Sequence, residues 1–328
     1  MRCISRAKSA ALVCVASISL FTGGCIGGKG ATPVTAYELK NYNQDLYQGK
    51  LYAEELCVAQ NDVALEGYTE DTELHSAALF DLTGERVLYS YKAHERLYPA
   101  STTKMITALL AIENANLDDQ VTISGNADAS SFSADAQVCG LAKGEVWTLR
   151  DLLGALLLYS GNDAATAIAE YVGGSEEAFV NMMNRRAQEL MANGTHFMNP
   201  HGLHDDNHYT TAYDLYLIFN ECIKHEDFVN IIQSEAYTAY YTDVDGNSQE
   251  ALFTPTNLYA QGEVDVPENV TIVGGKTGTT DEAGYCLILM EKDSSDNPYI
   301  SIVMGASEKP VLYEDMTSLI EAIPSGQQ

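Results

Sequence analysis

The sequence predicts an α+β fold in which an antiparallel β-sheet is flanked by helices and carries an inserted helical lobe. The order of the apolar patterns along the 328 residues leads to this prediction. A strand hairpin comes first, a long block of helical periodicity follows, and strand patterns return before one last helix. Strands and helices that come in blocks, rather than in strict alternation, favour an antiparallel sheet. A hydrophobic content of 46% supplies a sizeable core.

The first strand pair is predicted at residues 77–81 and 86–91, because Leu82-Thr83-Gly84-Glu85 between them is typical of a hairpin turn. Apolar periodicity and capping signals then predict helices at residues 105–113, 148–159, 163–171, 176–192 and 211–224. Strand patterns return at residues 236–242, 250–254, 270–274, 284–290 and 299–304, and residues 313–323 predict a closing helix. We expect the returning strands to complete the sheet that the first hairpin begins.

Residues 1–24 have the pattern of a secretory signal peptide. A basic start, formed by Arg2, Arg6 and Lys8, precedes an apolar run over residues 9–21 that is too short for a permanent membrane span. We therefore expect the protein to be exported and to work outside the cytoplasm.

Cys25 directly follows this segment, and small residues before a cysteine resemble the lipobox of bacterial lipoproteins. Thr22 stands where that pattern prefers leucine, so an ordinary cleavage site is the alternative. With Cys25 lipidated, residues 25–74 would be a lipid-anchored tether and N-terminal segment, and residues 75–328 the folded domain. Contact with the membrane is then expected through the N-terminal lipid alone.

The formal net charge of −28 makes the chain strongly acidic. Binding to phosphate backbones requires a basic face, so nucleic acid is not expected as a partner. The same charge argues against electrostatic attachment to anionic lipids. Acidity of this degree favours solubility and says little about the fold.

Four cysteines follow Cys25 in the chain, namely Cys57, Cys139, Cys222 and Cys286. An exported protein can pair its cysteines, and four of them allow three connectivities. They are widely scattered, however, and a domain of this size does not need disulfides to fold. Buried free thiols are therefore the preferred interpretation.

Three short motifs suggest chemistry: Ser101-Thr102-Thr103-Lys104, Ser160-Gly161-Asn162 and Lys276-Thr277-Gly278. Each one alone is weak, because Ser5 and Lys8 repeat the first inside the leader and Ser124-Gly125-Asn126 repeats the second. The order of the set and its local settings carry the prediction. Ser160 ends one apolar helical run and precedes another, whereas Ser124 lies in a polar stretch that resembles a surface turn.

Ser101 is predicted to be a nucleophile and Lys104 its base. Serine and lysine three positions apart at the start of a helix lie on one face, so the amine can reach the hydroxyl. Lys104 can accept a proton only when it is neutral, which requires burial or a nearby cation. We expect Lys276 to be that cation and Ser160 to relay the proton to the leaving group.

The remaining motif residues are predicted to bind substrate. Asn162 would hold the substrate amide, and Lys276 with the Thr277 hydroxyl would bind a terminal carboxylate. The Thr279 N–H group, together with that of Ser101, would form an oxyanion hole. Gly278 would allow a substrate backbone to approach the strand that ends at this motif.

The set of motifs resembles the low-molecular-mass penicillin-binding proteins, which are serine-type D-alanyl-D-alanine carboxypeptidases. The resemblance covers residues 75–323 and is carried by Tyr98–Met105, Asp151–Ala165, Asn199–Leu203, His208–Asp214 and Gly275–Tyr285. It implies a β-lactamase/transpeptidase-like fold with the site between the sheet and the helical lobe. It also implies a peptidoglycan stem peptide ending in D-Ala-D-Ala as substrate, β-lactams as acylating inhibitors, and a place facing the cell wall.

Two departures from the family pattern stand out. Relatives often carry an arginine near the end of the sheet, but no arginine follows Arg186. Either Lys309 takes its place or the contact is missing. About 50 residues follow the third motif, enough for the last strands and helix but not for the further domain of many relatives. Any membrane anchor is therefore expected at Cys25.

The sequence leaves three alternative functions to consider. A class A β-lactamase needs a glutamate-activated water, and no Glu-x-x-x-Asn occurs in the expected loop. A catalytically weak penicillin-binding sensor or scaffold remains the alternative of a different class. A zinc site is disfavoured because Pro200 and Gly202 interrupt any helical face, and no metal or cofactor is expected. The histidines that invite that interpretation are His196, His201, His204 and His208.

Overall fold

The structure, a computed structural model, describes residues 55–65 and 75–324. The predicted signal peptide, Cys25 and most of the tether lie outside these residues. Within the described part of the chain, no helix is long and apolar enough to cross a membrane.

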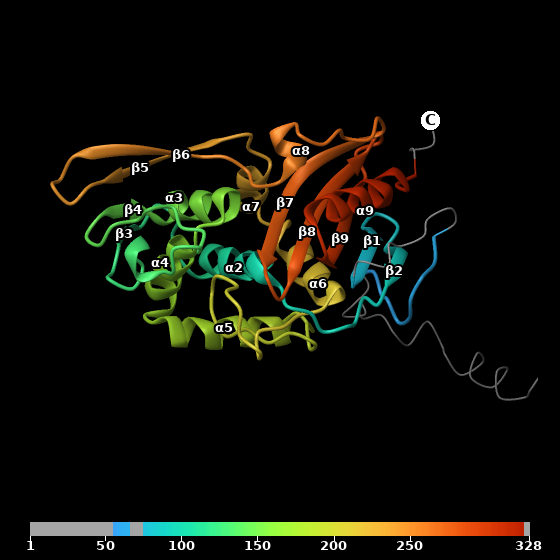
Figure 1. The fold of residues 1–328 in the computed structure, drawn as a ribbon, viewed down its shortest axis with the longest axis horizontal. Helices are drawn as coiled ribbons and strands as arrows, with labels where there is room; N and C mark the ends of the chain where they lie inside the picture. Colours follow the sequence, from blue (N-terminus) through green and yellow to red (C-terminus); the bar gives the residue numbers. More distant parts are fainter. Residues whose placement is uncertain (1–54, 66–74, 325–328) are drawn as a thin grey trace, which may run out of the picture. The chain divides into compact units, whose positions relative to one another are not determined.

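A five-stranded antiparallel sheet forms the centre of the fold, with the strand order β2-β1-β9-β8-β7 (Figure 1). Its strands are β1 (Ser76–Asp81), β2 (Arg86–Tyr91), β7 (Val270–Thr280), β8 (Gly284–Asp293) and β9 (Pro298–Ala306). The N-terminal hairpin is confirmed, since Ala77 pairs with Tyr91 and Asp81 with Arg86. The last strand, β9, returns to pair with β1, so the two ends of the domain meet in one sheet.

Helices cover both faces of this sheet. One face packs against α9 (Lys309–Glu321), whose apolar side chains form a core with those of β8 and β9. The other face packs against α2 (Lys104–Asn114) and α6 (Ala212–Cys222) in a second and larger core. The other helical segments are η2 (Ala100–Thr103), η3 (Ala129–Ser131), α3 (Leu149–Gly154), η4 (Ala155–Tyr159), α4 (Asn162–Gly173), α5 (Glu176–Glu189), α7 (Glu226–Ile232) and α8 (Leu258–Gln261).

A second sheet lies on the helical lobe, which is formed by the helices between β2 and β7. Its presence shows that the predicted strand pairing was wrong. It has the order β3-β4-β5-β6 and consists of β3 (Gln120–Thr122), β4 (Val146–Thr148), β5 (Tyr237–Thr242) and β6 (Ser248–Phe253). The strands predicted at residues 236–242 and 250–254 exist, but they do not join the main sheet. Aromatic packing explains their place, because Tyr241 of β5 pairs with Trp147 of β4 and the two rings stack at 4.2 Å.

The folded unit begins before residue 75, where the sequence placed its start. The backbone N–H of Cys57 donates a hydrogen bond of 2.9 Å to the Tyr216 hydroxyl. Val63 exchanges two backbone hydrogen bonds of 2.9 Å with Ser90 of β2. Part of the predicted tether is therefore an integral piece of the domain.

The preference for free thiols is confirmed for the four cysteines that the structure describes. Three of them, Cys57, Cys222 and Cys286, are buried, and burial raises their pKa. Cys139 lies within the loop that borders the cleft described below, and burial also raises its pKa. A raised pKa keeps these thiols protonated and inert at neutral pH.

Candidate active site

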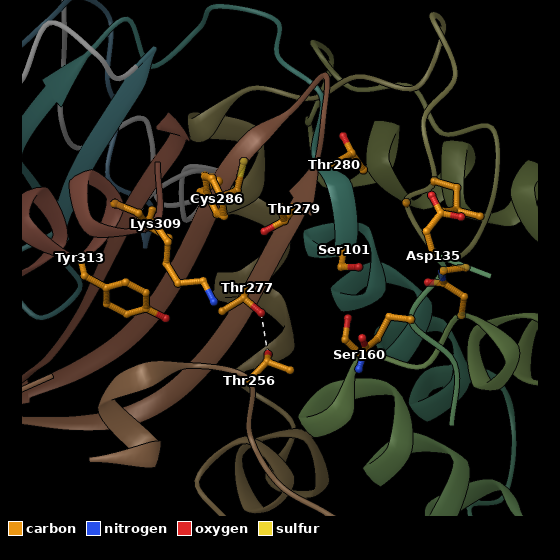
Figure 2. A pocket seen from close by; sticks show the side chains of 17 residues that line it. Ser101, Asp135, Ser160, Thr256, Thr277, Thr279, Thr280, Cys286, Lys309 and Tyr313 are labelled. Atoms are coloured by element: carbon orange, nitrogen blue, oxygen red, sulfur yellow. Dashed lines mark hydrogen bonds between the residues drawn. The ribbon is translucent and has the colours of Figure 1, made fainter. Parts of the chain in front are cut away.

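A cleft of about 340 Å³ opens between β7 and the helical lobe (Figure 2). Both serines of the predicted site, Ser101 and Ser160, line it. Predicted substrate-binding residues that also line it are Asn162, Thr277 and Thr279. Further lining residues are Asp135, Ala136, Gln137, Gly202, Leu203, Thr256, Thr280, Tyr285, Cys286, Lys309, Leu312 and Tyr313.

Close backbone contacts fix the position of Ser101 within η2, directly before α2. A Cβ atom at Gly202, whose φ is +91°, would overlap the carbonyl oxygen of Ala100. A Cβ atom at Gly278 would lie 3.0 Å from the Ser101 nitrogen. The loop at Gly202 and strand β7 can therefore lie against the backbone of Ala100 and Ser101 only because both positions are glycine.

The amine of Lys104 has three oxygen neighbours and no exposed surface. Its Nζ lies 2.8 Å from the Ser101 hydroxyl, 2.7 Å from Asn162 Oδ1 and 2.6 Å from the carbonyl oxygen of His201. The pKa of Lys104 is lowered well below its ordinary value, first by burial and then by the charge of Lys276.

These neighbours dictate what a neutral Lys104 can do. A neutral amine has two N–H bonds and one lone pair. Asn162 Oδ1 and the His201 carbonyl can only accept hydrogen bonds, so they take both N–H donors. The lone pair then points at Ser101, whose O–H becomes the donor. The arrangement can therefore remove the Ser101 proton.

Ser160 and Lys276 join the two walls of the cleft. Lys276 Nζ donates a hydrogen bond of 2.8 Å to Ser160 Oγ and another of 2.9 Å to the Thr277 carbonyl. Ser160 has a left-handed backbone with φ of +71°, which directs its side chain out of the turn that ends η4. Burial lowers the pKa of Lys276 to about 7.

The place of Lys276 in the strand differs from the prediction. The sequence put the motif at the end of a strand, but β7 continues to Thr280, and Lys276 pairs with Ile288 in its interior. Sheet pairing therefore fixes the backbone that carries this ammonium. A position inside the ladder also leaves the side chain 1% exposed, which is the cause of its lowered pKa.

Asp163 supports the site and was missed in the sequence. Its buried carboxylate accepts hydrogen bonds of 2.9 to 3.1 Å from the backbone N–H groups of Cys139, Gly140 and Leu141. These contacts hold the loop that borders the cleft against the start of α4. An acidic residue in the first turn of a helix was the one available signal, and it is common at helix starts.

On the sheet side of the cleft, the Thr277 hydroxyl lies 2.6 Å from that of Thr256. Lys309 begins α9 and Tyr313 follows one turn later, and both side chains face the cleft in Figure 2. The expectation that Lys309 could serve the site therefore has a structural basis, because its ammonium lies on the same side as Thr277.

The histidine-rich loop makes structural hydrogen bonds. Both ring nitrogens of His208 are engaged, Nε2 with the Thr103 hydroxyl at 2.8 Å and Nδ1 with the Met198 N–H at 3.1 Å. The backbone carbonyl oxygen of His201 accepts a hydrogen bond from Lys104 Nζ. These contacts leave the nitrogens of His208 no lone pair for a metal ion.

The second copy of the Ser-Gly-Asn motif lies elsewhere. The Ser124 hydroxyl accepts hydrogen bonds of 3.1 Å from the backbone nitrogens of Asn126 and Ala127, which makes it part of a local turn. Ser160 is the copy that lines the cleft, as expected.

Comparison with known proteins agrees with this geometry. A family model described as Peptidase_S11, D-alanyl-D-alanine carboxypeptidase, matches residues 64–308. The chain belongs to this family. Its N-terminal limit lies eleven residues before the predicted domain start at residue 75 and nine residues after the first described residue, Glu55.

Curated relatives in this family are 30–34% identical to the chain over the aligned residues. D-alanyl-D-alanine carboxypeptidase DacF of Bacillus subtilis is 34% identical over 254 residues, which are 76% of this chain and 61% of the relative. D-alanyl-D-alanine carboxypeptidase DacC of Escherichia coli is 30% identical over 249 residues, which are 74% of this chain and 59% of the relative. The chain thus spans about three fifths of these relatives' length.

Solved structures confirm the predicted fold class. The DD-transpeptidase of Streptomyces K15 superposes with a TM-score of 0.71 and 28% identity, covering 78% of this chain and 98% of that one. Penicillin-binding protein 5 of Haemophilus influenzae has a TM-score of 0.68 and 27% identity, covering 78% of this chain and 72% of that one. Both comparisons support the penicillin-binding fold, with mixed helices and antiparallel strands.

Proposed function

We propose that this chain is a serine-type D-alanyl-D-alanine carboxypeptidase that forms an acyl-enzyme at Ser101. Its substrate would be a peptidoglycan stem peptide that ends in D-Ala-D-Ala. The observation that carries the proposal is the buried amine of Lys104, 2.8 Å from the Ser101 hydroxyl and held by two acceptor oxygens. Membership of the D-alanyl-D-alanine carboxypeptidase family supports the reaction.

In the proposed acylation, Lys104 removes the Ser101 proton as Oγ attacks the carbonyl carbon of the penultimate D-Ala. The backbone N–H groups of Ser101 and Thr279 would stabilise the oxyanion. The C–N bond then breaks, and the departing D-Ala amine receives the proton through the Ser160 hydroxyl. Asn162 binds the substrate amide and also orients Lys104 through its side-chain oxygen.

Deacylation reverses the roles of these groups. A water molecule gives its proton to Lys104 and attacks the ester carbonyl, and the Ser101 oxygen leaves with a proton. The products are the shortened peptide and the free enzyme, so every proton is returned.

Recognition of the terminal carboxylate is assigned to the sheet side of the cleft. Lys309 and the Thr277 hydroxyl line this side, and the buried ammonium of Lys276, bonded to the cleft-lining Ser160, supplies a second positive charge. Gly278 keeps β7 free of a side chain where the strand meets the backbone of Ser101. A charge-assisted hydrogen bond to a carboxylate is stronger than a neutral one, so these residues would select a free C-terminus.

Labelling with a fluorescent penicillin tests the acyl-enzyme. The wild-type chain should be labelled and Ser101→Ala should not, because a β-lactam mimics the peptide and esterifies the same hydroxyl. Equal labelling of both proteins would reject Ser101 as the nucleophile. Release of D-alanine from a stem-peptide mimic separates a carboxypeptidase from a penicillin-binding sensor, and rapid turnover of nitrocefin would indicate a β-lactamase.

Export and anchoring complete the proposal. Residues 1–24 would direct secretion, and lipidation of Cys25 would hold the enzyme at the cell membrane facing the wall. Incorporation of labelled palmitate into the wild-type chain in a bacterial host, and its loss in Cys25→Ala, is the expected result. Labelling that persists in Cys25→Ala would reject Cys25 as the anchor.

A further inference from the structure

The cleft is electrically polarised across its nucleophile. Among the described residues that line it, Asp135 is the sole acidic side chain and Lys309 the sole basic one. Figure 2 shows Ser101 between them, with Lys309 on the side of α9 and Asp135 on the opposite side. The cleft therefore presents a positive and a negative charge to the two ends of one bound molecule.

Backbone hydrogen bonds fix the loop that carries Asp135, whose side chain is exposed to solvent. The backbone N–H of Ala136 donates 3.0 Å to the Ser133 carbonyl, which closes a turn around Asp135. The Gln137 carbonyl accepts 2.8 Å from the backbone N–H of Asn162, within the Ser-Gly-Asn motif itself. A hydrogen bond from Ser133 lowers the pKa of Asp135, so the side chain is a carboxylate at neutral pH.

The positions of Lys309 and Asp135 on opposite sides of Ser101 indicate which end of a bound peptide lies on each side. In an acyl transfer, the leaving group lies on one side of the attacked carbonyl and the acyl chain on the other. If Lys309 and Thr277 hold the carboxylate of the leaving D-Ala, the acyl chain extends past Ser101 toward Asp135. A carboxylate there is complementary to a cation on that chain.

We propose that Asp135 is a specificity residue that binds a free primary amine on the acyl part of the substrate. The inference rests on the proposed function, because it takes its direction from carboxylate binding near Lys309. The substrate class is then a stem peptide whose residue before D-Ala-D-Ala is a diamino acid with an uncapped side-chain amine. A peptide whose amine is already acylated, as in a cross-link, loses this contact.

Two peptides that differ in one acetyl group test the proposal on the full chain. They are Nα-acetyl-L-Lys-D-Ala-D-Ala, with a free side-chain amine, and its Nα,Nε-diacetyl form. For the wild type we expect kcat/KM to favour the free amine by about threefold or more at low salt, and the ratio to fall as salt is added. For Asp135→Asn the ratio should fall to about one.

Asp281→Asn is the matched control, because Asp281 is an exposed acid next to the cleft-lining Thr280 but does not line the cleft. It should keep the wild-type ratio, which shows that general attraction to an acidic protein is not the cause. A ratio that survives in Asp135→Asn, or is lost equally in Asp281→Asn, overturns the proposal.

A second assay separates this inference from the carboxypeptidase proposal. Ampicillin is benzylpenicillin with one added primary amine, and both acylate a penicillin-binding serine without any need for peptide turnover. If neither peptide is cleaved, the carboxypeptidase proposal fails, but the ratio of the two acylation rates still reports on Asp135. Loss of the ampicillin preference in Asp135→Asn supports the inference, and an unchanged ratio, or no acylation by either drug, rejects it.

Discussion

Lys276 donates a hydrogen bond of 2.8 Å to the hydroxyl of Ser160, and this contact joins the middle of strand β7 on one wall to the turn after η4 on the other. In the proposed mechanism, the ammonium would therefore serve both carboxylate binding and the proton relay. Its burial lowers its pKa to about 7. If this group binds the substrate carboxylate, its deprotonation near neutral pH should appear in the pH dependence of kcat/KM.

The pH dependence of kcat/KM should fall on the alkaline side near pH 7. Above this pH the free enzyme loses the charge of Lys276, and the carboxylate of the substrate binds less well. The acid limb belongs to Lys104, whose lowered pKa supplies the neutral base. In the complex the substrate carboxylate favours the charged form of Lys276, so the alkaline limb of kcat should lie at higher pH.

Lys276→Arg is the variant that checks this assignment. A guanidinium does not titrate in this range, so the alkaline limb of kcat/KM should move above about pH 9. Penicillin acylation, followed from pH 5 to 10 in both proteins, gives the profiles. An alkaline limb that stays near pH 7 in the variant assigns it to another group.

Replacement of the base should stop acylation without loss of the fold. Lys104→Met keeps an unbranched side chain one atom shorter but removes the proton acceptor, so the penicillin acylation rate should fall by about 10²–10⁴-fold. Lys143→Met, at an exposed lysine, is the control and should acylate like the wild type. Thermal unfolding of both variants should resemble that of the wild type, and an active Lys104→Met protein would exclude Lys104 as the base.

The helices and the motif residues were accessible from sequence because their signals are local. Apolar periodicity predicts α2 and α6 within a few residues, and Ser101 and Lys104 are three positions apart on one turn. The second sheet was not accessible. A strand pattern at β5 indicates that a strand exists, but its pairing with the three-residue strand β4 depends on the contact between Trp147 and Tyr241, nearly a hundred residues apart.

The supporting residues of the site were missed for the same reason. Asp163 acts on backbone N–H groups more than 20 residues away, and Asp135 matters because its loop is tied to Asn162. Neither has a distinctive neighbour in the chain. Lys309 could be named from sequence, but its place beside Tyr313 in the cleft depends on how α9 packs on β8 and β9.

Lys309 should contribute to carboxylate recognition. Lys309→Gln removes one of two positive charges on the sheet side of the cleft, so kcat/KM for a D-Ala-D-Ala peptide should fall roughly tenfold. With a peptide whose C-terminal carboxylate is replaced by an amide, the variant and the wild type should differ little. Lys292→Gln, which removes a surface charge paired with Asp296, is the control. Equal losses on acid and amide peptides would argue against a contact with the carboxylate.

Two glycines with similar backbone angles allow the cost of a left-handed backbone to be measured separately from the cost of a steric overlap. Gly202 and Gly246 have φ of +91° and +86°, but a Cβ at Gly246 meets no atom within 4 Å. Gly246→Ala should therefore lower the free energy of unfolding by about 1 kcal/mol, the cost of a left-handed alanine. Gly202→Ala should lower it by roughly 1–3 kcal/mol more, because its methyl overlaps the Ala100 carbonyl.

The same pair tests how tightly the nucleophile is positioned. A shift of Ala100 moves Ser101, so Gly202→Ala should also slow penicillin acylation, by up to about 10²-fold for a displacement near 1 Å. Gly246→Ala should acylate at the wild-type rate. Urea denaturation and acylation kinetics on both variants provide the test, and equal stabilities would show that the loop relaxes around the added methyl.

Glu291 offers a prediction about stability rather than catalysis. This carboxyl lies on β8 with no exposed surface, on the side that packs against α9, and neither of its oxygens has a well-formed hydrogen bond. Burial raises its pKa well above the ordinary value, an effect that Ser301 only partly offsets. The folded state therefore holds a proton on Glu291 at pH values where the unfolded chain has released it.

The sign of the pH effect follows from linkage. Where the folded state binds more protons than the unfolded state, the free energy of unfolding falls as pH rises. Between about pH 5 and 8 the wild type should thus lose more stability than Glu291→Gln, which cannot ionise. At pH 8 the variant should be the more stable protein by roughly 1–3 kcal/mol, because an ionisable group no longer has to stay protonated inside the sheet. Urea denaturation at pH 5 and at pH 8 gives the free energies of unfolding of the wild type and of Glu291→Gln. Glu250→Gln, at an exposed position of strand β6, is the control. Parallel pH dependences in wild type and Glu291→Gln would mean that water or a neighbouring group already neutralises the buried carboxyl.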